Sequence, residues 1–263
     1  MRKILSFVLI AAILVASLGL VSCQEKKSAY EVVSEAITKT TSMNSFSFNC
    51  NLKSSTTEDG ETTNEDIKLE YVISGIKNEK PEYSAKITTS AENMTITMGY
   101  VFKGGTYYVD AFGFKVKTSE GDEGFDEQGL DDMEPKFVYE MLIVQIPEEL
   151  LKDAEIKEED GKKSVEISIP AEKFTEVFKK WGESMNEEEG DTKLSDIKLE
   201  IVIAENGYLA EYNLSFGVEE TYEGVVSKGT GSYFITFNNP GQEASVELPE
   251  DAADYMSAAE MAG

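Results

Sequence analysis

The chain has 263 residues, with 50 acidic and 24 basic side chains, no histidine and a formal net charge of −26. A surface this acidic repels nucleic acid, which binds proteins that neutralise its phosphates, and it also repels anionic lipid headgroups. The lack of histidine excludes imidazole ligands for a transition metal and a cysteine–histidine catalytic pair.

A secretion signal is the first feature in chain order. Two basic residues precede an almost purely apolar run over residues 4–21, and the small Ser22 stands directly before Cys23, as in a signal peptide. A run of about 18 residues also has the borderline length of a membrane-spanning helix. The motif LVSC, which ends at Cys23, resembles a bacterial lipobox, in which the chain is cut before the cysteine and the thiol receives a diacylglyceryl group. This resemblance favours a cleaved signal over a retained helix.

Cleavage before Cys23 would divide the chain into a signal peptide (1–22), an acylated cysteine with a short tether (23–27) and a single domain (28–263). The mature chain then has 22 basic against 50 acidic residues, a net charge of −28. Each buried methylene of an acyl chain, such as palmitate, contributes about 0.8 kcal/mol to membrane binding. The protein is therefore expected at the extracytoplasmic face of the cell membrane, held there by lipid.

The first predicted element of the domain is a helix over residues 28–41. Ser28 and Glu31 have the spacing of a capping box, and Tyr30, Val33 and Ile37 recur on one face. This face should pack against the rest of the domain.

A series of alternating segments follows the helix and predicts antiparallel strands with one apolar and one solvated face. Cys50 alternates with Phe46, Phe48 and Leu52, which places it on the apolar face as a core residue. The predicted strands cover residues 45–53, 66–74, 83–89, 94–102, 106–110 and 112–117.

The segment 119–134 is rich in acidic residues and glycine and is predicted to be a surface loop. Such a composition suits calcium, but the spacing of the acids is not that of an EF-hand loop. No metal site is assigned to it, and weak binding of counter-ions is the simpler expectation.

Two further helices are predicted. The first begins at Pro135, in the stretch PKFVYEMLIVQI, and is apolar nearly all round. The second, after the predicted strand KKSVEISIP, places Phe174, Phe178 and Trp181 on one face. These helices either roof a fully packed core or line a cavity for an apolar ligand.

The C-terminal part predicts two pairs of strands. Asn206-Gly207 is a strong hairpin signal between two alternating segments. Pro240-Gly241 then separates SYFITFNN from ASVELP, which is predicted to be the last strand. The octamer DIKLEYVI from Asp66 recurs as DIKLEIVI from Asp196, which leaves an internal duplication open.

Taken together, the lipobox, the short tether, the helix followed by MNSFSFNCNL, the many strands interrupted by two apolar helices and the terminal VELPEDAADY resemble the LolA/LppX-like group of bacterial lipoproteins. This resemblance implies an α+β fold in which a strongly curved antiparallel sheet, an incomplete β-barrel, packs on two or three helices. In that group the enclosed apolar space can hold acyl chains.

Three classes of function stay open. The first is a carrier of a lipid or other apolar ligand in a groove between sheet and helices. The second is a ligand-free envelope or sensor domain that acts through protein contacts on its acidic surface, with its protein partner unknown. An enzyme is the least favoured, and no catalytic residue or cofactor is assigned. The candidate groove residues are Phe46, Phe48, Leu69, Tyr71, Phe137, Met141, Phe174, Phe178, Trp181, Leu199, Tyr212 and Leu214.

Overall fold

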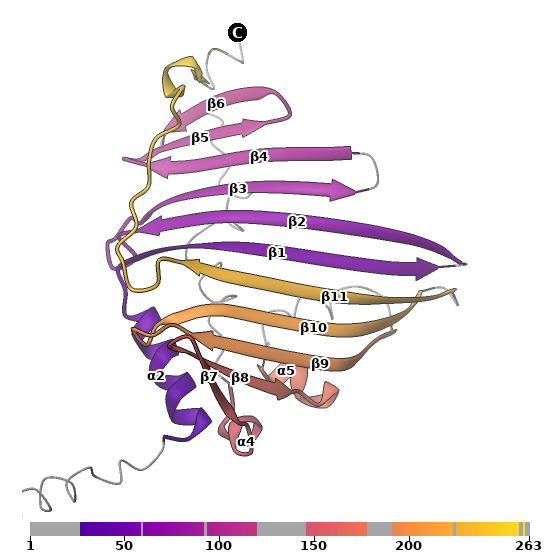
Figure 1. The fold of residues 1–263 in the computed structure, drawn as a ribbon. Coiled ribbons are helices and arrows are strands. Elements are labelled where there is room, and N and C mark those ends of the chain that lie inside the picture. Colours follow the sequence, from indigo (N-terminus) through magenta and orange to yellow (C-terminus); the bar gives the residue numbers. More distant parts are fainter. Residues whose placement is uncertain are drawn as a thin grey trace, which may run out of the picture.

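The computed structural model describes residues 27–58, 60–91, 94–119, 146–177, 191–222, 225–257 and 260. In these residues a single twelve-stranded sheet has the order β12-β6-β5-β4-β3-β2-β1-β11-β10-β9-β8-β7. Neighbouring strands are antiparallel except β12 and β6, which are parallel, and the sheet does not close on itself (Figure 1). The expected α+β fold, with a curved, unclosed antiparallel sheet and two or three helices, is confirmed at this level.

The described elements follow the chain in a simple order, with long central strands and short strands at the edges. The helices are α2 (Ala29–Thr41), α4 (Glu148–Leu151) and α5 (Ala171–Val177), with a short 3-10 helix η3 (Ala252–Asp254). The strands are β1 (Ser45–Glu58), β2 (Glu61–Ser74), β3 (Glu82–Ala91), β4 (Met94–Lys103), β5 (Thr106–Ala111), β6 (Phe114–Ser119), β7 (Ile156–Glu159), β8 (Lys162–Ser168), β9 (Asp191–Ile203), β10 (Leu209–Tyr222), β11 (Val225–Asn238) and β12 (Met256–Ser257).

Helix α2 begins with the predicted capping box. The backbone amide of Glu31 donates to Oγ of Ser28 over 3.2 Å, and the amide of Ser28 donates to Oε2 of Glu31 over 2.8 Å. Because the box satisfies two otherwise unpaired amides, the helix starts at a defined residue. The predicted apolar face is also confirmed, since Val33 and Ile37 are buried.

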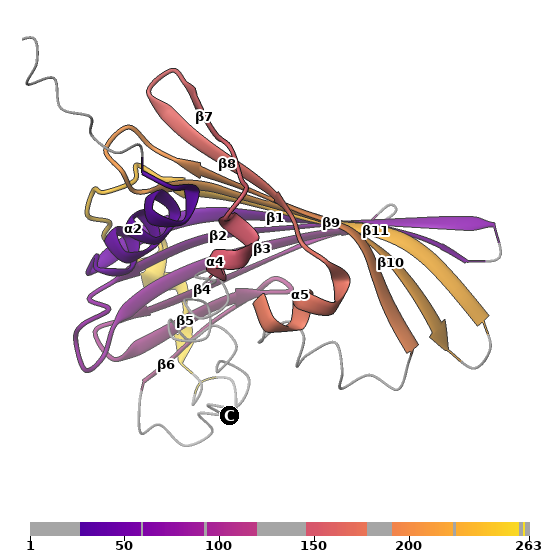
Figure 2. The same cartoon turned by 90° about the horizontal axis from the view of Figure 1, so that it is seen from below.

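The helices of the described residues pack on one half of the sheet. α2 packs on β9 and β10, α5 on β9, and α4 on β8 and on α2. α4 and α5 lie on one side of the sheet, and the tips of β10 and β11 turn away from those of β1 and β2 (Figure 2). The sheet is therefore strongly twisted, and its β1–β6 half lies away from the principal helix contacts.

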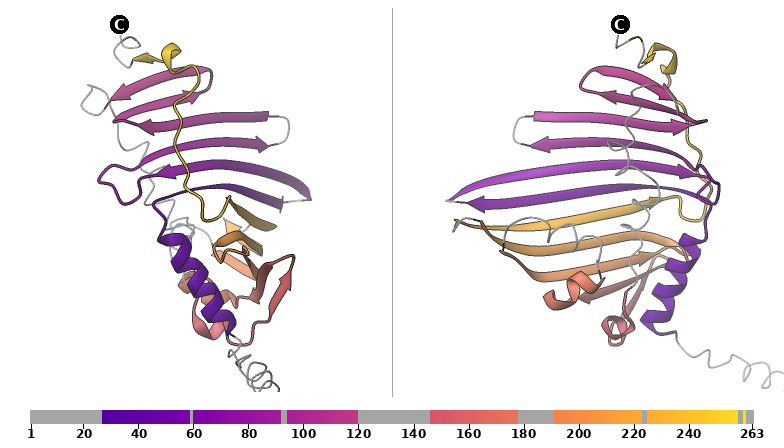
Figure 3. Two further views of the ribbon diagram at one scale, coloured as in Figure 1. Left: turned by 60° about the vertical axis from the view of Figure 1, so that its left-hand side comes forward. Right: turned by 180° about the vertical axis from the view of Figure 1, so that it is seen from behind.

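The predicted last strand over residues 244–249 is wrong. The chain runs instead as an irregular segment, the C-terminal strap (residues 239–257), from the end of β11 to β12 beside β6 (Figure 3). No strand could form next to β11, because β11 is already hydrogen-bonded to β1 and β10. The strap is fixed by the amide of Ala244, which donates to Oγ of Ser45 over 2.9 Å, and by the ammonium of Lys103, which donates to the carbonyl of Val246.

In two hairpins the backbone conformation of the turn residues determines where the strands begin and end. The predicted turn at Asn206-Gly207 is confirmed, with Gly207 at φ 81° between β9 and β10. The strand predicted from Phe112 begins only at Phe114, because Phe112 and Gly113 have φ of 54° and 82° and form the turn from β5. The predicted strand KKSVEISIP is confirmed as β8, whereas β7 and helix α4, which are both short, were not predicted.

Candidate functional site

Alternate residues of the strands share the side of the sheet on which the helices lie, and we call this side the inner face. In the centre of the sheet Phe48 is paired with Phe237 on β11 and with Tyr71 on β2, and Tyr71 is paired with Ala85 on β3. All four side chains are buried. The residues between them along each strand form the outer face.

The structure brings the described candidate groove residues together on the inner face and its helical cover. The half-buried Leu69 packs against their core cluster, whose buried members include Phe46, Phe48, Tyr71, Phe174, Leu199, Tyr212 and Leu214. Phe137, Met141, Phe178 and Trp181 lie outside the described residues, as do Ser22 and Cys23. That the set lines a groove stays a prediction.

A chain of aromatic rings crosses the inner face from β1 to β5. It starts with Phe48 and Tyr71, whose ring centroids are 5.3 Å apart, and it ends with Phe102 and Tyr107, at 4.3 Å. Tyr83 joins the two pairs, with its centroid 6.2 Å from that of Tyr71 and 5.8 Å from that of Phe102. These spacings are those of attractive aromatic pairs, so the rings form one continuous apolar floor.

Next to this floor, toward the β3–β4 turn, the inner face stays apolar but is only half-buried. We call this region the apolar strip. Its members are Ile67, Leu69, Ile87, Ile96, Met98, Val109 and Val116. The strand register pairs Leu69 with Ile87, Ile87 with Met98, and Val109 with Val116. Thr89 stands between Ile67 and Ile96, and Tyr100 is the partner of Val109 on β4.

The described helices pack mainly on β8 to β10, and the apolar strip lies outside this half of the sheet. Exposure increases further at its end, where Met94 is 61% and Phe114 59% exposed. A contiguous apolar surface of this kind marks a site of interaction more often than a scattered set of exposed apolar residues does. The strip is therefore the candidate functional site.

Three titratable groups on the inner face of β1, β11 and β10 are held in their neutral forms. Burial raises the pKa of the Cys50 thiol to about 11, so that the thiol is protonated at neutral pH and is a poor nucleophile. Burial also raises the pKa of Tyr233 to about 12, with a smaller contribution from Cys50, and raises the pKa of Tyr212. The register of Cys50 with Leu69 and Ile235 confirms its predicted place on the inner face.

The described part of the chain contains no group of three or more acidic or cysteine side chains placed to hold a metal ion. The acidic segment considered for calcium lies, from residue 120 on, outside the described residues. In the described residues no helix combines the length and the apolar character needed to cross a bilayer.

Most of the apolar strip was missed by sequence reasoning, which singled out only Leu69. The signal was present, because Ile87, Ile96 and Met98 stand at the apolar positions of alternating segments. Alternation shows which face of a strand is apolar, but it does not show which part of that face the helices leave open.

No family model matches the chain, and no curated protein matches it in sequence. Among solved structures, LprF from Mycobacterium bovis is similar with 13% identity and a TM-score of 0.42, over 84% of this chain and 96% of that chain. A DUF1329 family protein from Desulfovibrio piger is similar with 9% identity and a TM-score of 0.23, over 86% of this chain and 96% of that chain. Likeness at this level does not bear on what the present chain binds.

Proposed function

We propose that this protein is a lipid-anchored lipoprotein at the extracytoplasmic face of the cell membrane and that it takes an apolar ligand, such as an acyl chain, on the inner face of its sheet. The observation that carries the proposal is the apolar strip, which is half-buried across β2 to β6. Covering apolar surface contributes about 25 cal/mol per Å². The strip thus offers binding free energy that the described part of the fold does not use.

The shape of the strip favours a long, thin ligand. It crosses five neighbouring strands from Leu69 to Val116, and four strand spacings of about 4.8 Å give a length of about 19 Å. An extended acyl chain fits such a track better than a compact solute does. Its members are aliphatic side chains and a methionine, which adapts to irregular apolar partners.

The protein would act by binding and not by catalysis. Its described thiol is protonated at neutral pH because burial raises the pKa of Cys50 to about 11, and the strip contains no acid–base pair. The covalent anchor supplies the membrane contact that a net charge of −28 would otherwise oppose.

The test is the amount of lipid that stays with the full chain after extraction from membranes. Native mass spectrometry separates noncovalent lipid from the covalent anchor, which remains in the mass of the protein. Ile96→Asp places a charge in the strip and should reduce the bound lipid at least tenfold. Thr97→Asp is the matched control, because the exposed Thr97 is the next residue of β4 and lies on the outer face.

Lipid retained by the unchanged chain and by Thr97→Asp, and lost from Ile96→Asp, supports the proposal. A clean protein mass without noncovalent lipid in all three would contradict it. That result would leave the ligand-free domain, acting through protein contacts on its acidic surface, as the better account.

A further inference from the structure

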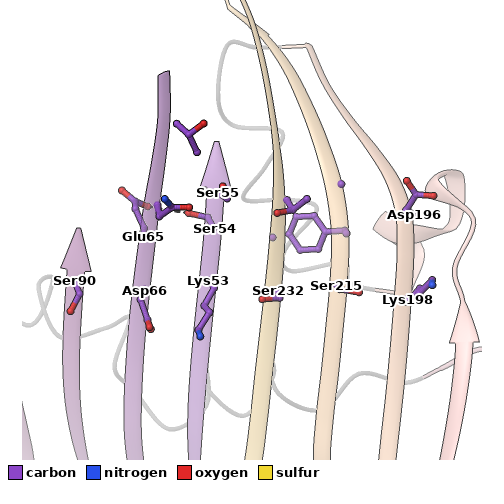
Figure 4. A pocket seen from close by; sticks show the side chains of 16 residues that line it. Lys53, Ser54, Ser55, Glu65, Asp66, Ser90, Asp196, Lys198, Ser215 and Ser232 are labelled. Atoms are coloured by element: carbon purple, nitrogen blue, oxygen red, sulfur yellow. Dashed lines mark hydrogen bonds between the residues drawn. The ribbon is translucent and has the colours of Figure 1, made fainter. Parts of the chain in front are cut away.

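The outer face of the sheet carries a second hollow that the apolar strip does not explain. Its volume is about 950 Å³, and most of its lining comes from outer-face residues of successive strands between β3 and β9 (Figure 4). The inner-face row of Ser54, Glu65, Gly231 and Phe216 also contributes to the lining. One row of paired outer-face residues crosses it completely: Asp66, Lys53, Ser232, Ser215 and Lys198. The next row contains Asn64, Ser55, Thr230 and Gly217.

Seven serine and threonine residues and Asn64 line the hollow, together with charged side chains and the ring of Phe216. Gly217 contributes no side chain, and it packs closely on β9, since a Cβ at this position would lie 2.5 Å from Oγ of Ser195. The hollow contains two lysines, Lys53 and Lys198, and three acids, Glu65, Asp66 and Asp196. In a chain of net charge −26, this surface is unusual because its charges are nearly balanced.

An exposed aromatic ring stands beside the hollow. Phe234 is 46% exposed and is the outer-face residue next to Ser232 along β11. Its register partners on the two neighbouring strands are Asn51 and Asn213. A flat apolar ring is thus surrounded by groups that donate and accept hydrogen bonds.

Several polar groups of this face have hydrogen-bonding capacity that the protein does not use. The Oδ1 atoms of Asn51, Asp66 and Asn213 are shielded and have no hydrogen-bond donor in the described part of the chain. Lys53 and Lys198 have no ion-pair partner there. Of these residues, Asp66, Lys53 and Lys198 line the hollow, and the two asparagines lie beside Phe234. Because buried polar groups are normally paired, these unused groups indicate a surface suited to a polar ligand.

We propose that the outer hollow binds a neutral glycan, with one sugar ring stacked on Phe234 and the following rings lying along the rows of serine, threonine and asparagine. A pyranose ring presents a face of C–H bonds to an aromatic ring and a rim of hydroxyl groups to hydrogen-bonding side chains. An apolar ligand would leave the polar lining unpaired. Nucleic acid is disfavoured by the charge of the whole protein.

The test is isothermal titration calorimetry on the full chain in a zwitterionic detergent without a sugar headgroup, with chitohexaose, cellohexaose and maltohexaose as probes. Saturable binding of at least one probe is expected. Phe234→Ala should weaken it about tenfold, as the loss of one aromatic stacking contact implies. Val226→Ala is the matched control and should leave the affinity unchanged. Val226 lies on the same face of β11 and is similarly exposed, at 47%, but it is not part of the hollow.

Circular dichroism of both variants shows whether the sheet is intact. Ile96→Asp, on the opposite face, should bind the glycan normally, so the outcome is independent of the apolar ligand proposed above. Absence of saturable binding for all three probes at millimolar concentration would overturn the proposal. Equal weakening by Phe234→Ala and Val226→Ala would overturn it as well.

Discussion

The backbone amide of Leu209 donates a hydrogen bond of 2.9 Å to the side-chain hydroxyl of Thr40. Both residues are buried, with 2% of Thr40 and none of Leu209 exposed. The pairing of β9 with β10 shifts register directly after Leu209, at the point where the hydroxyl meets the strand. One side chain at the end of α2 thereby fixes the helix to the start of β10.

Thr40→Val should destabilise the protein by about 1–3 kcal/mol, because it keeps the shape of the side chain but leaves a buried amide without its acceptor. Thr38→Val is the matched control: it makes the same change on the exposed side of the same helix. Urea unfolding followed by circular dichroism measures both. Equal effects of the two substitutions would mean that helix propensity, and not the contact with Leu209, is responsible.

Phe112→Asn should stabilise the protein by about 1 kcal/mol. Phe112 has a φ of 54° and is 71% exposed, and a left-handed conformation costs a residue other than glycine or asparagine about 1–2 kcal/mol. Phe114→Asn serves as the control, since Phe114 is 59% exposed but lies in the extended strand β6. Thermal unfolding measures the melting temperature of both variants. A melting temperature of Phe112→Asn no higher than that of Phe114→Asn would contradict this account of the turn.

The fold was predictable where local patterns determine it. The capping box of Ser28 and Glu31 fixes the start of α2, and Gly207 provides the positive φ of the β9–β10 turn. The strap was not predictable, because Val246 and Leu248 alternate like strand residues although only Val246 is buried. Whether such a segment pairs depends on whether a neighbouring strand has a free edge, which is a property of the topology.

The candidate sites were predictable only in part for the same reason. Phe48 and Tyr71 could be placed on the apolar face by alternation, and the register confirms that they are paired. The outer hollow combines Lys53 with Lys198, which are far apart in the sequence and come together only through the order β1-β11-β10-β9. Residue patterns define the faces of single strands, whereas a site made by several strands requires their order.

The stability of the protein should fall between pH 9 and 11 because of Cys50. Burial raises the pKa of this thiol from its usual value of 9.0 to about 11. In this window the unfolded chain loses the thiol proton while the folded chain keeps it, so unfolding becomes more favourable as the pH rises. The contribution is fully present below pH 9, and the two-unit shift corresponds to about 3 kcal/mol.

Lysine and tyrosine side chains also titrate in this range, so the measurement compares the unchanged chain with Cys50→Val, in which the thiol is replaced by a side chain of similar size. Urea unfolding at several pH values gives the free energy of unfolding of both proteins. The difference between the unchanged chain and Cys50→Val should change steadily toward pH 11. A difference that stays constant from pH 8 to 11 would show that the Cys50 thiol does not ionise differently in the two states.

The last prediction concerns Cys23, the proposed acceptor of the lipid. Its thiol stands at the end of the lipobox-like motif LVSC, and lipid transfer to sulfur must precede cleavage if the motif acts as proposed. Cys23→Ser should therefore accumulate as an uncleaved precursor that takes up no radiolabelled fatty acid. Cys50→Ser, which removes the other cysteine of the chain, should be cleaved and labelled like the unchanged protein. Equal labelling of the Cys23→Ser and Cys50→Ser variants would show that the lipid is not attached to Cys23. The proposed function would then lose its covalent anchor, and the negative charge of the mature chain would oppose binding to an anionic membrane.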